Sequence, residues 1–436
     1  MQTHPITPRR RRWRRLAIAA LVVGGALAAW AGWALYAASS FSGRIAAIRA
    51  AGDPASIADL APKPIPADED AAAQLAAVAP QIEAFARDHG RFFNTPLGKA
   101  YDEARGRGEP ATSEQLSAIK TILDGFPEID AAVTKAAACD RYGSRLDYSL
   151  PQPQFLNAAL DSSIRTVARY GQWQMEVAMA EGRHADALQQ GVELLRLGRL
   201  FQAEPGLIGG MVAAAIRDSA ARVIYDSLAA GSAPAELHAA LDRELAIQDD
   251  MQPFVLTLKS ERAMVIEALQ SQFGGMAGLF MNTVGRPMKM HHTAILDLFD
   301  AVLPLAAEPW HKVAGKSPPN AVFKKPTGLG TMADLLQPSI EGAYETANRS
   351  LAMTRSLRIY NALRQYAAKH GREAEGLADL RLPKEATTDP FSGEPMKLKR
   401  TDEGWVVYSV AKDGRDDGGL LREQNDYGVG PAKLRD

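Results

Sequence analysis

The longest hydrophobic pattern in the chain is an uninterrupted apolar run at residues 16–38, which reads LAIAALVVGGALAAWAGWALYAA. It contains no charged residue, and about 20 apolar residues of helix span the hydrocarbon core of a bilayer. Six arginines lie just before it, within residues 1–15, and the positive-inside rule places such a basic tail in the cytoplasm. The pattern predicts one N-terminal transmembrane helix, with the rest of the chain exported to the periplasm or beyond.

A cleaved signal peptide is the alternative interpretation of the same run. The apolar region of a signal peptide normally covers about 7–15 residues, which is shorter than the run found here. The small residues at 37–40 (AASS) nevertheless offer a place for cleavage. We expect an uncleaved single-pass anchor in the cytoplasmic membrane, followed by a linker rich in Pro and Asp over 39–66.

Apolar side chains beyond the linker recur mainly every three or four positions, the spacing of one face of an α-helix. Two such stripes, at 156–178 and 187–201, lie on either side of Gly182 and predict an antiparallel pair of helices. The polar, proline-bounded stretch 140–153 predicts a long loop. Further stripes predict helices over 71–89, 113–123, 129–138, 207–230 and 253–272.

The pattern changes after Gly371 to short alternating segments separated by turns. Strands are predicted at 396–398 and 405–410, joined by a polar hairpin. The predicted fold is therefore mainly α. It consists of the transmembrane helix, an irregular helical exported body over 67–350, and a small α+β module with a β-hairpin over 351–436.

Composition supports a helical body and narrows the function. Apolar residues make up 46% of the chain, enough for a buried core, and the abundant alanine favours helix. Apart from the six N-terminal arginines, 44 basic residues stand against 51 acidic ones, so the remainder carries a charge of −7. This balance argues against nucleic acid as a partner, because its binders need clustered Lys and Arg. Cys139 is the single cysteine, so no intramolecular disulfide can form.

Two neighbouring motifs in the C-terminal module carry the candidate chemistry. Residues 389–395 (DPFSGEP) form a predicted turn, and residues 412–419 (KDGRDDGG) form an acidic loop with glycines. Calcium prefers six to eight hard oxygen ligands, and glycines allow backbone carbonyls to turn toward an ion. The loop is therefore a candidate calcium site, and a solvated acidic turn without metal is the alternative.

The module resembles the globular domain of the major pseudopilin of type II secretion. There, too, a long helix leads into a DP-x-x-G-x-P turn, a hairpin, a tyrosine–serine strand and an acidic glycine loop. The aromatic–proline pair that follows the helix in that family is missing, since Gly-Arg-Glu stands at 371–373. The resemblance implies that the loop binds calcium. It implies as ligands, by position, Asp413, Asp416, Asp417, Asn425 and Asp426.

The whole chain is similar to large membrane-anchored envelope proteins of planctomycete-type bacteria. Those proteins join an alanine-rich helical body to a tail of this kind, and their bodies often carry a Ser/Gly-Glu-Arg-Ala stretch. Here that stretch is Ser260-Glu261-Arg262-Ala263. The similarity implies an architecture and gives no activity.

Glu261 and Arg262 are further candidate functional residues because of their position. They interrupt an apolar stripe on the helix predicted over 253–272, and a charge on a buried face must be paired. One interpretation is a site residue in a groove, and the other is a structural ion pair. A cluster of methionines and histidines within 276–292 suggests either soft copper ligands or flexible apolar packing.

The sequence contains no H-E-x-x-H, G-x-S-x-G, phosphate-binding P-loop or C-x-x-C motif. We therefore predict a non-enzymatic, membrane-anchored scaffold or adaptor. Its helical body would offer a groove to a protein partner, and calcium would stiffen its C-terminal module. Two alternatives stay open: an exported hydrolase with its site in the helical body near Glu261, and an accessory of a secretion or pilus-like apparatus.

Overall fold

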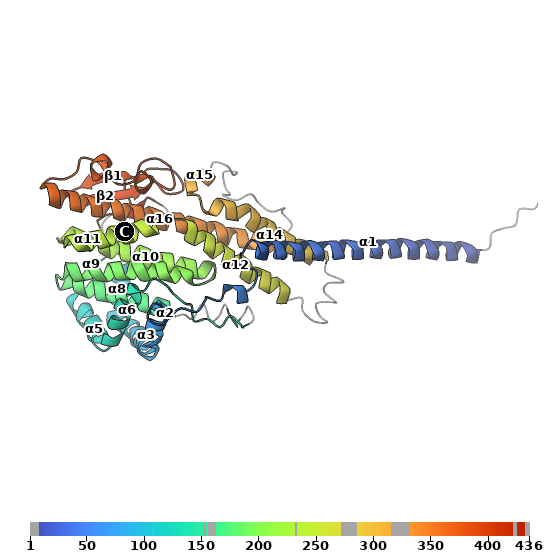
Figure 1. The fold of residues 1–436 in the computed structure, drawn as a ribbon, viewed down its shortest axis with the longest axis horizontal. Coiled ribbons are helices and arrows are strands. Elements are labelled where there is room, and N and C mark those ends of the chain that lie inside the picture. The colour runs from blue at the N-terminus through green and yellow to red at the C-terminus, as the bar shows by residue number, and fades with distance from the viewer. Residues whose placement is uncertain are drawn as a thin grey trace, which may run out of the picture.

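The computed structural model describes residues 8–107, 109–150, 154–155, 163–231, 233–271, 286–314, 332–421 and 425–431. They form a mainly helical protein with a small antiparallel sheet near the C-terminus (Figure 1). The helices are α1 (Pro8–Ala50), α2 (Ala71–Ala76), α3 (Ala79–Phe93), α4 (Pro96–Gly106), α5 (Ser113–Leu123), α6 (Pro127–Ala138), α8 (Ile164–Ala180), α9 (His184–Leu200), α10 (Gly206–Ala230), α11 (Ala235–Gln248), α12 (Gln252–Ser271), α14 (Arg286–Ala306), α15 (Trp310–Ala314) and α16 (Met332–His370). Short 3₁₀ turns are η1 (Ala58–Leu60), η2 (Phe201–Ala203), η3 (Leu377–Leu380) and η4 (Glu385–Thr387), and the strands are β1 (Lys397–Thr401), β2 (Gly404–Ser409) and β3 (Tyr427–Val429).

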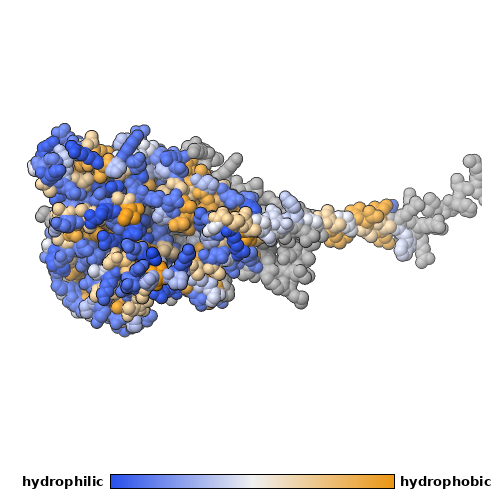
Figure 2. Space-filling model, in the orientation of Figure 1, coloured by the Kyte–Doolittle hydropathy of each residue, from blue (hydrophilic) through white to orange (hydrophobic). Residues whose placement is uncertain are grey.

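The membrane-spanning part of the predicted fold needs correction. Among the helices that the structure describes, none is both long and apolar enough to cross a membrane. This finding contradicts the transmembrane helix predicted at 16–38. The apolar run lies inside α1, a continuous helix of 43 residues that begins in the basic segment and ends in polar turns. Helix α1 projects from the body, and apolar residues are exposed along it (Figures 1 and 2).

The end of α1 belongs to the globular body. Phe41 and Ile45 are buried there, and Arg44 forms ion pairs with Asp297 and Asp300 of α14 at 2.6 and 2.5 Å. The predicted linker over 39–66 is therefore helical as far as Ala50. The sequence pattern did not reveal this continuation, because only three large apolar side chains (Phe41, Ile45 and Ile48) mark the face that packs.

Among the described residues, two large hydrophobic cores lie along the body, with a small third cluster around Met264. The larger is built around α8, α9 and α10, with Trp173, Leu188 and Ile224 fully buried in it. The smaller gathers the end of α1 with α12, α14, α15 and the first half of α16 around Phe299 and Tyr344. Helix α16 joins the two cores, because its second half packs on α10, α11 and the sheet.

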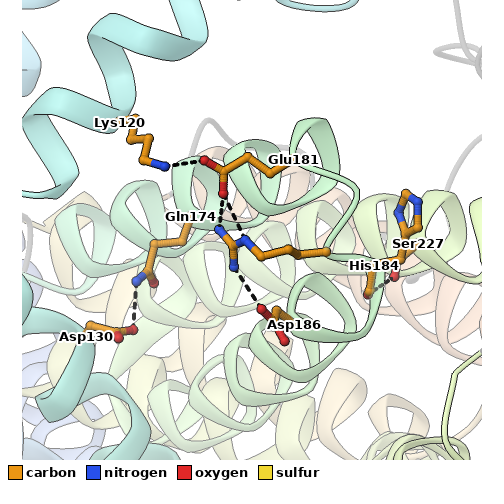
Figure 3. A network of polar contacts seen from close by, with 8 residues as sticks. Lys120, Asp130, Gln174, Glu181, His184, Asp186 and Ser227 are labelled. Carbon is orange, nitrogen blue, oxygen red and sulfur yellow. Dashed lines mark hydrogen bonds and ion pairs between the residues drawn. The ribbon is translucent and has the colours of Figure 1, made fainter.

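Helices α8 and α9 form the predicted antiparallel pair. The turn between them contains Gly182 at φ +74°, a left-handed conformation that favours glycine. Arg183 binds both Glu181 and Asp186, and Lys120 of α5 also pairs with Glu181 (Figure 3). This charged cluster is exposed, and it fixes the turn to α5.

The sheet has the order β1-β2-β3, antiparallel throughout. The predicted hairpin is confirmed by the pairing of β1 and β2, and β3 was not predicted. Asp389 of the predicted turn is fully buried and accepts hydrogen bonds from the hydroxyl of Ser409 and the N–H of Val410. The turn is thereby fastened to the end of β2. The boundary predicted between 350 and 351 falls inside α16.

Candidate functional site

Buried acidic side chains meet an apolar pocket at the N-terminus of α10. The pocket encloses about 260 Å³ between the starts of α8 and α10, the middle of α12 and the first half of α16. Its lining is mostly apolar, with two carboxyl groups and one guanidinium. The lining residues are Ile164, Arg165, Phe201, Glu204, Pro205, Gly206, Leu207, Ile208, Gly209, Met211, Val212, Glu261, Met264, Leu336 and Ser339.

The start of α10 positions Glu261. The first N–H groups of a helix have no acceptor within the helix, and here α12 supplies two. The N–H of Leu207 donates to Glu261 Oε2 at 2.9 Å, and the N–H of Gly206 donates to Ser260 Oγ at 2.7 Å. The positive end of the helix dipole also favours a carboxylate at this place.

Gly206 allows this close approach. Its φ is +86°, and a Cβ atom built on it would lie 2.3 Å from Met264 Cε and 3.1 Å from Glu261 Oε2. A side chain here would therefore displace the end of the buried Met264 side chain, which glycine leaves in place between α10 and α12. The short distance between the two helices keeps the Glu261 carboxyl at the pocket wall.

Glu204 reaches the pocket from the turn that precedes α10. Only 7% of its surface is exposed, and its two oxygens accept hydrogen bonds from the hydroxyls of Tyr142 (2.8 Å) and Ser144 (2.9 Å). Both donors belong to the predicted loop over 140–153. A buried polar group needs such partners, because losing water without replacement costs free energy.

Within the described part of the chain, no cation neutralises either carboxyl group. Burial raises the pKa of Glu204 and of Glu261, because it removes water that would solvate the charge. Among the described residues, neither carboxylate forms an ion pair. Arg165 lines the pocket with an exposed side chain, and no ion pair between it and either carboxylate is found in the structure. Carboxyl groups perturbed in this way within a cleft mark a candidate site for acid–base chemistry or for binding a cation.

The neighbouring residue Arg262 does not line the pocket and instead contacts the segment that follows α1. It is 4% exposed and forms an ion pair with Asp53 at 2.9 Å, and Lys259 pairs with the same carboxylate at 2.7 Å. Both interpretations of the Glu-Arg pair therefore apply, one to each residue. Arg262 ties α12 to the segment after α1, whereas Glu261 lines the pocket.

In the C-terminal loop, the structure brings three of the predicted calcium ligands close together. Asp426 is almost fully buried, and burial, with the nearby negative charges of Asp416 and Asp417, raises its pKa to about 6. Asp426 Oδ2 accepts the N–H of Gly419 at 2.7 Å, and the backbone N–H of Asp417 also favours the ionised carboxyl group. Among the described residues, Oδ1 has no hydrogen-bond partner. A buried carboxylate oxygen without a donor fits a cation.

Other contacts hold the remaining groups of the loop. Asp413 is exposed and accepts the N–H of Arg415 at 3.1 Å within its own turn. Asn425 turns its amide nitrogen toward Asp417, at 2.8 Å, so its oxygen does not join the acids. In the part of the chain that the structure describes, no group of three or more His, Cys, Asp or Glu side chains is arranged to hold a metal ion.

Two lysine side chains contact oxygen atoms that a calcium ion in this loop would need as ligands. Lys399 donates to the carbonyl of Gly418 at 2.6 Å, and Lys397 lies 3.9 Å from Asp416. Calcium would need these contacts to open so that the carbonyl and the carboxylate could face the ion.

Sequence reasoning found Glu261 and missed Glu204, Tyr142 and Ser144. The segments that carry them lie far apart in the chain, and only the packing of α10 against α12 and the 140–153 loop brings them together. The one local signal is Glu204-Pro205-Gly206, a turn before a helix. Of the methionine–histidine cluster, Met276 and Met281 lie outside the described residues, as do the side chains of Met288, Met290, His291 and His292.

Comparison with known proteins identifies no relative. No family model, no curated protein and no solved structure matches the chain. The resemblances to the major pseudopilin domain and to planctomycete-type envelope proteins therefore stay predictions. The function has to be argued from the two sites themselves.

Proposed function

We propose that this protein is a non-enzymatic scaffold or adaptor, and that its pocket at the start of α10 takes up an apolar segment of a protein partner. The observation that carries the proposal is the apolar rim of the pocket. Ile208 is 41% exposed and Met211 is 39% exposed. Outside α1, the other large apolar side chains exposed among the described residues are Ile247 and Leu256.

The pocket has the general properties of a binding site. Such sites are concave and mostly apolar, with a few polar groups that fix orientation. Exposed apolar side chains at the mouth extend the surface that a partner can cover, and their burial contributes about 25 cal/mol per Å². Since helices form the walls, the site exists before a partner arrives.

A photo-crosslinking amino acid at position 211 tests this proposal in cells. We expect a defined crosslinked protein from position 211, and none of the same mass from position 247 or 256. The change Ile208→Asp should abolish the crosslink, because it puts a charge on the apolar rim. The matched change Ile247→Asp should leave the crosslink in place.

Two results would count against the proposal. Equal crosslinking from all three positions would indicate general stickiness of exposed apolar side chains. A crosslink from position 211 that survives Ile208→Asp would place the partner outside the pocket.

A second candidate function is the exported hydrolase, and the paired carboxyl groups of Glu204 and Glu261 favour it. General acid–base catalysis needs a carboxyl group whose pKa is raised by burial, as both are. A panel of chromogenic esters and glycosides tests it. Turnover that is lost in both Glu204→Gln and Glu261→Gln supports an enzyme, and no turnover across the panel removes this candidate.

We further propose that calcium binds the C-terminal loop through Asp416, Asp417 and Asp426. The unpartnered Asp426 Oδ1 and the adjacent acidic charges support this assignment. Location at the cytoplasmic membrane, with the N-terminus in the cytoplasm and the body outside it, stays a prediction that cell fractionation can test. A role beside a secretion or pilus-like apparatus also stays a prediction, since it rests on the resemblance of the tail alone.

A further inference from the structure

We propose that the pocket recognises a cationic group, so that the bound segment presents a lysine side chain or another primary amine among apolar residues. This inference rests on the proposed binding function, and it names the chemistry of the occupant. Its basis is a pair of carboxyl groups in an apolar pocket, for which the described residues provide no cation.

Several other buried acids of the helical body lie against a guanidinium. Glu244 contacts Arg199 at 2.7 Å, and Asp70 contacts Arg145 at 3.0 Å. Glu204 is as well buried, yet two neutral hydroxyls are its hydrogen-bond donors. Among the described residues, Glu204 therefore lacks the counter-charge that Glu244 and Asp70 have. Glu193 is also held by neutral donors, but it does not line the pocket.

Glu261 has room for a further partner. Its Oε2 accepts one backbone N–H, from Leu207, and among the described residues no other hydrogen bond to this side chain is found. A carboxylate accepts up to about four hydrogen bonds. An ammonium group donates three, and it can satisfy acceptors on both acids where they line one pocket.

The apolar wall suits the rest of such a ligand. A lysine side chain buries its methylene stem against apolar surface while its charged end seeks a polar partner. Ile208, Met211 and Val212 offer such a surface on α10, opposite Met264 of α12 and Leu336 of α16.

Charge selects the amine over other occupants. Two carboxyl groups repel an anionic ligand, and a neutral apolar ligand would leave them buried without a counter-charge. Arg165 lies on the exposed side of the pocket, where it opposes an incoming cation. Replacing it should therefore strengthen amine binding.

Three probes with the same apolar body and different charge test the inference on the full chain at neutral pH. They are 4-phenylbutylamine, 4-phenylbutanol and 4-phenylbutyrate, with binding measured by calorimetry and ligand-observed NMR. We expect the amine to bind at least tenfold more tightly than the alcohol, and the carboxylate to bind weakest. A tenfold change corresponds to about 1.4 kcal/mol.

Isosteric variants show which groups select the amine. Glu261→Gln and Glu204→Gln keep an acceptor and the side-chain volume, and each should weaken amine binding about tenfold while leaving the alcohol unchanged. Arg165→Gln should strengthen amine binding. Glu236→Gln, an exposed acid on α11, is the matched control and should change nothing. Melting without ligand verifies that each variant is folded.

The outcomes separate this inference from the proposed function. If amine and alcohol bind equally, or neither binds, the cation preference is overturned, whereas a pocket-dependent crosslink from position 211 would still support partner binding. If the amine is preferred but the crosslink is absent, the pocket takes amines and the partner proposal falls. An amine preference that survives both glutamine variants would also overturn the inference.

Discussion

The pocket and the C-terminal loop each hold a buried carboxyl group that pairs with no cation among the described residues, but the two sites are built differently. Glu204 and Glu261 are carried by segments around α10 and α12, and hydroxyls or a helix N-terminus hold them. Asp426 meets Asp416 and Asp417 within one stretch of glycine turns, and a backbone N–H holds it.

This difference determines what each site can do. Packed helices fix the pocket walls, so its shape exists without a ligand and can select by fit. In the loop, each acid is held by its own local contacts, and lysines lie against a carbonyl and a carboxylate. The loop must therefore rearrange around an ion, and binding there should show mainly as added stability.

The largest effect is expected from the glycine that lets α10 approach α12. Gly206→Ala places a methyl group 2.3 Å from Met264 Cε at a left-handed φ, so it should lower the free energy of unfolding by about 2–3 kcal/mol. Gly182→Ala is the matched control. Its φ is also left-handed, but its surroundings are open, so the loss should be about 1 kcal/mol.

Urea unfolding of the two variants measures the difference. Gly206→Ala should also weaken crosslinking from position 211, because the displaced Met264 side chain lines the same pocket. Equal destabilisation by the two changes would show that the close approach to α12 is not tight, and the contrast between a rigid pocket and an adaptable loop would weaken.

The same contrast between the loop and the pocket explains which features could be predicted from the sequence. Features formed by neighbouring residues were predicted best. The helix at 113–123 was predicted to the residue. Its start is encoded locally, since Thr112 and Gln115 form a capping box in the structure. The acids of the loop were recognised for the same reason, being neighbours in the chain.

The pocket depends on contacts between distant segments. Tyr142 reaches Glu204 across 62 positions, and no periodicity encodes that meeting. Strand β3 has three residues, too few for an alternating pattern, and it forms because β2 offers a free edge. The long extent of α1 was missed because its docking face is short, and the apolar run at 16–38 was then assigned to a membrane span.

The next effect in size is the response of the loop to calcium. At a free concentration 100 times its dissociation constant, calcium should raise the free energy of unfolding by about 2.7 kcal/mol, because it binds the folded chain alone. The double change Asp416→Ala and Asp417→Ala should abolish this gain, and a chelator should reverse it in the unchanged protein. Thermal melting measures both.

Two control variants test whether calcium binds at the C-terminal loop. Asp402→Ala removes an exposed acid from the neighbouring hairpin and should leave the calcium response intact. Glu261→Gln in the pocket should leave it intact as well. A response lost in either control would mean that calcium acts through general charge. If calcium gives no shift in the unchanged protein, the loop is a solvated acidic turn.

The smallest expected effect is the pH dependence of the free energy of unfolding, which can be measured for both sites. The pKa of Asp426 is raised from 3.8 to about 6 in the folded chain, so on increasing pH the unfolded chain loses this proton first. Stability from this group is therefore complete below pH 3.8 and falls as the pH rises toward 6. We expect a loss on the order of 1 kcal/mol, reduced by screening in the solvated loop.

Asp426→Asn should remove that loss, since asparagine does not titrate. Saturating calcium should remove it too, because the cation favours the ionised carboxylate and lowers its pKa. In the pocket, burial raises the pKa of Glu261, so stability again falls with rising pH, and there 4-phenylbutylamine rather than calcium should oppose the fall. Urea unfolding at pH 4, 5, 6 and 7 with each cation distinguishes the sites. A calcium effect on the pocket, or an amine effect on the loop, would show that the two acidic groups are not selective for different cations.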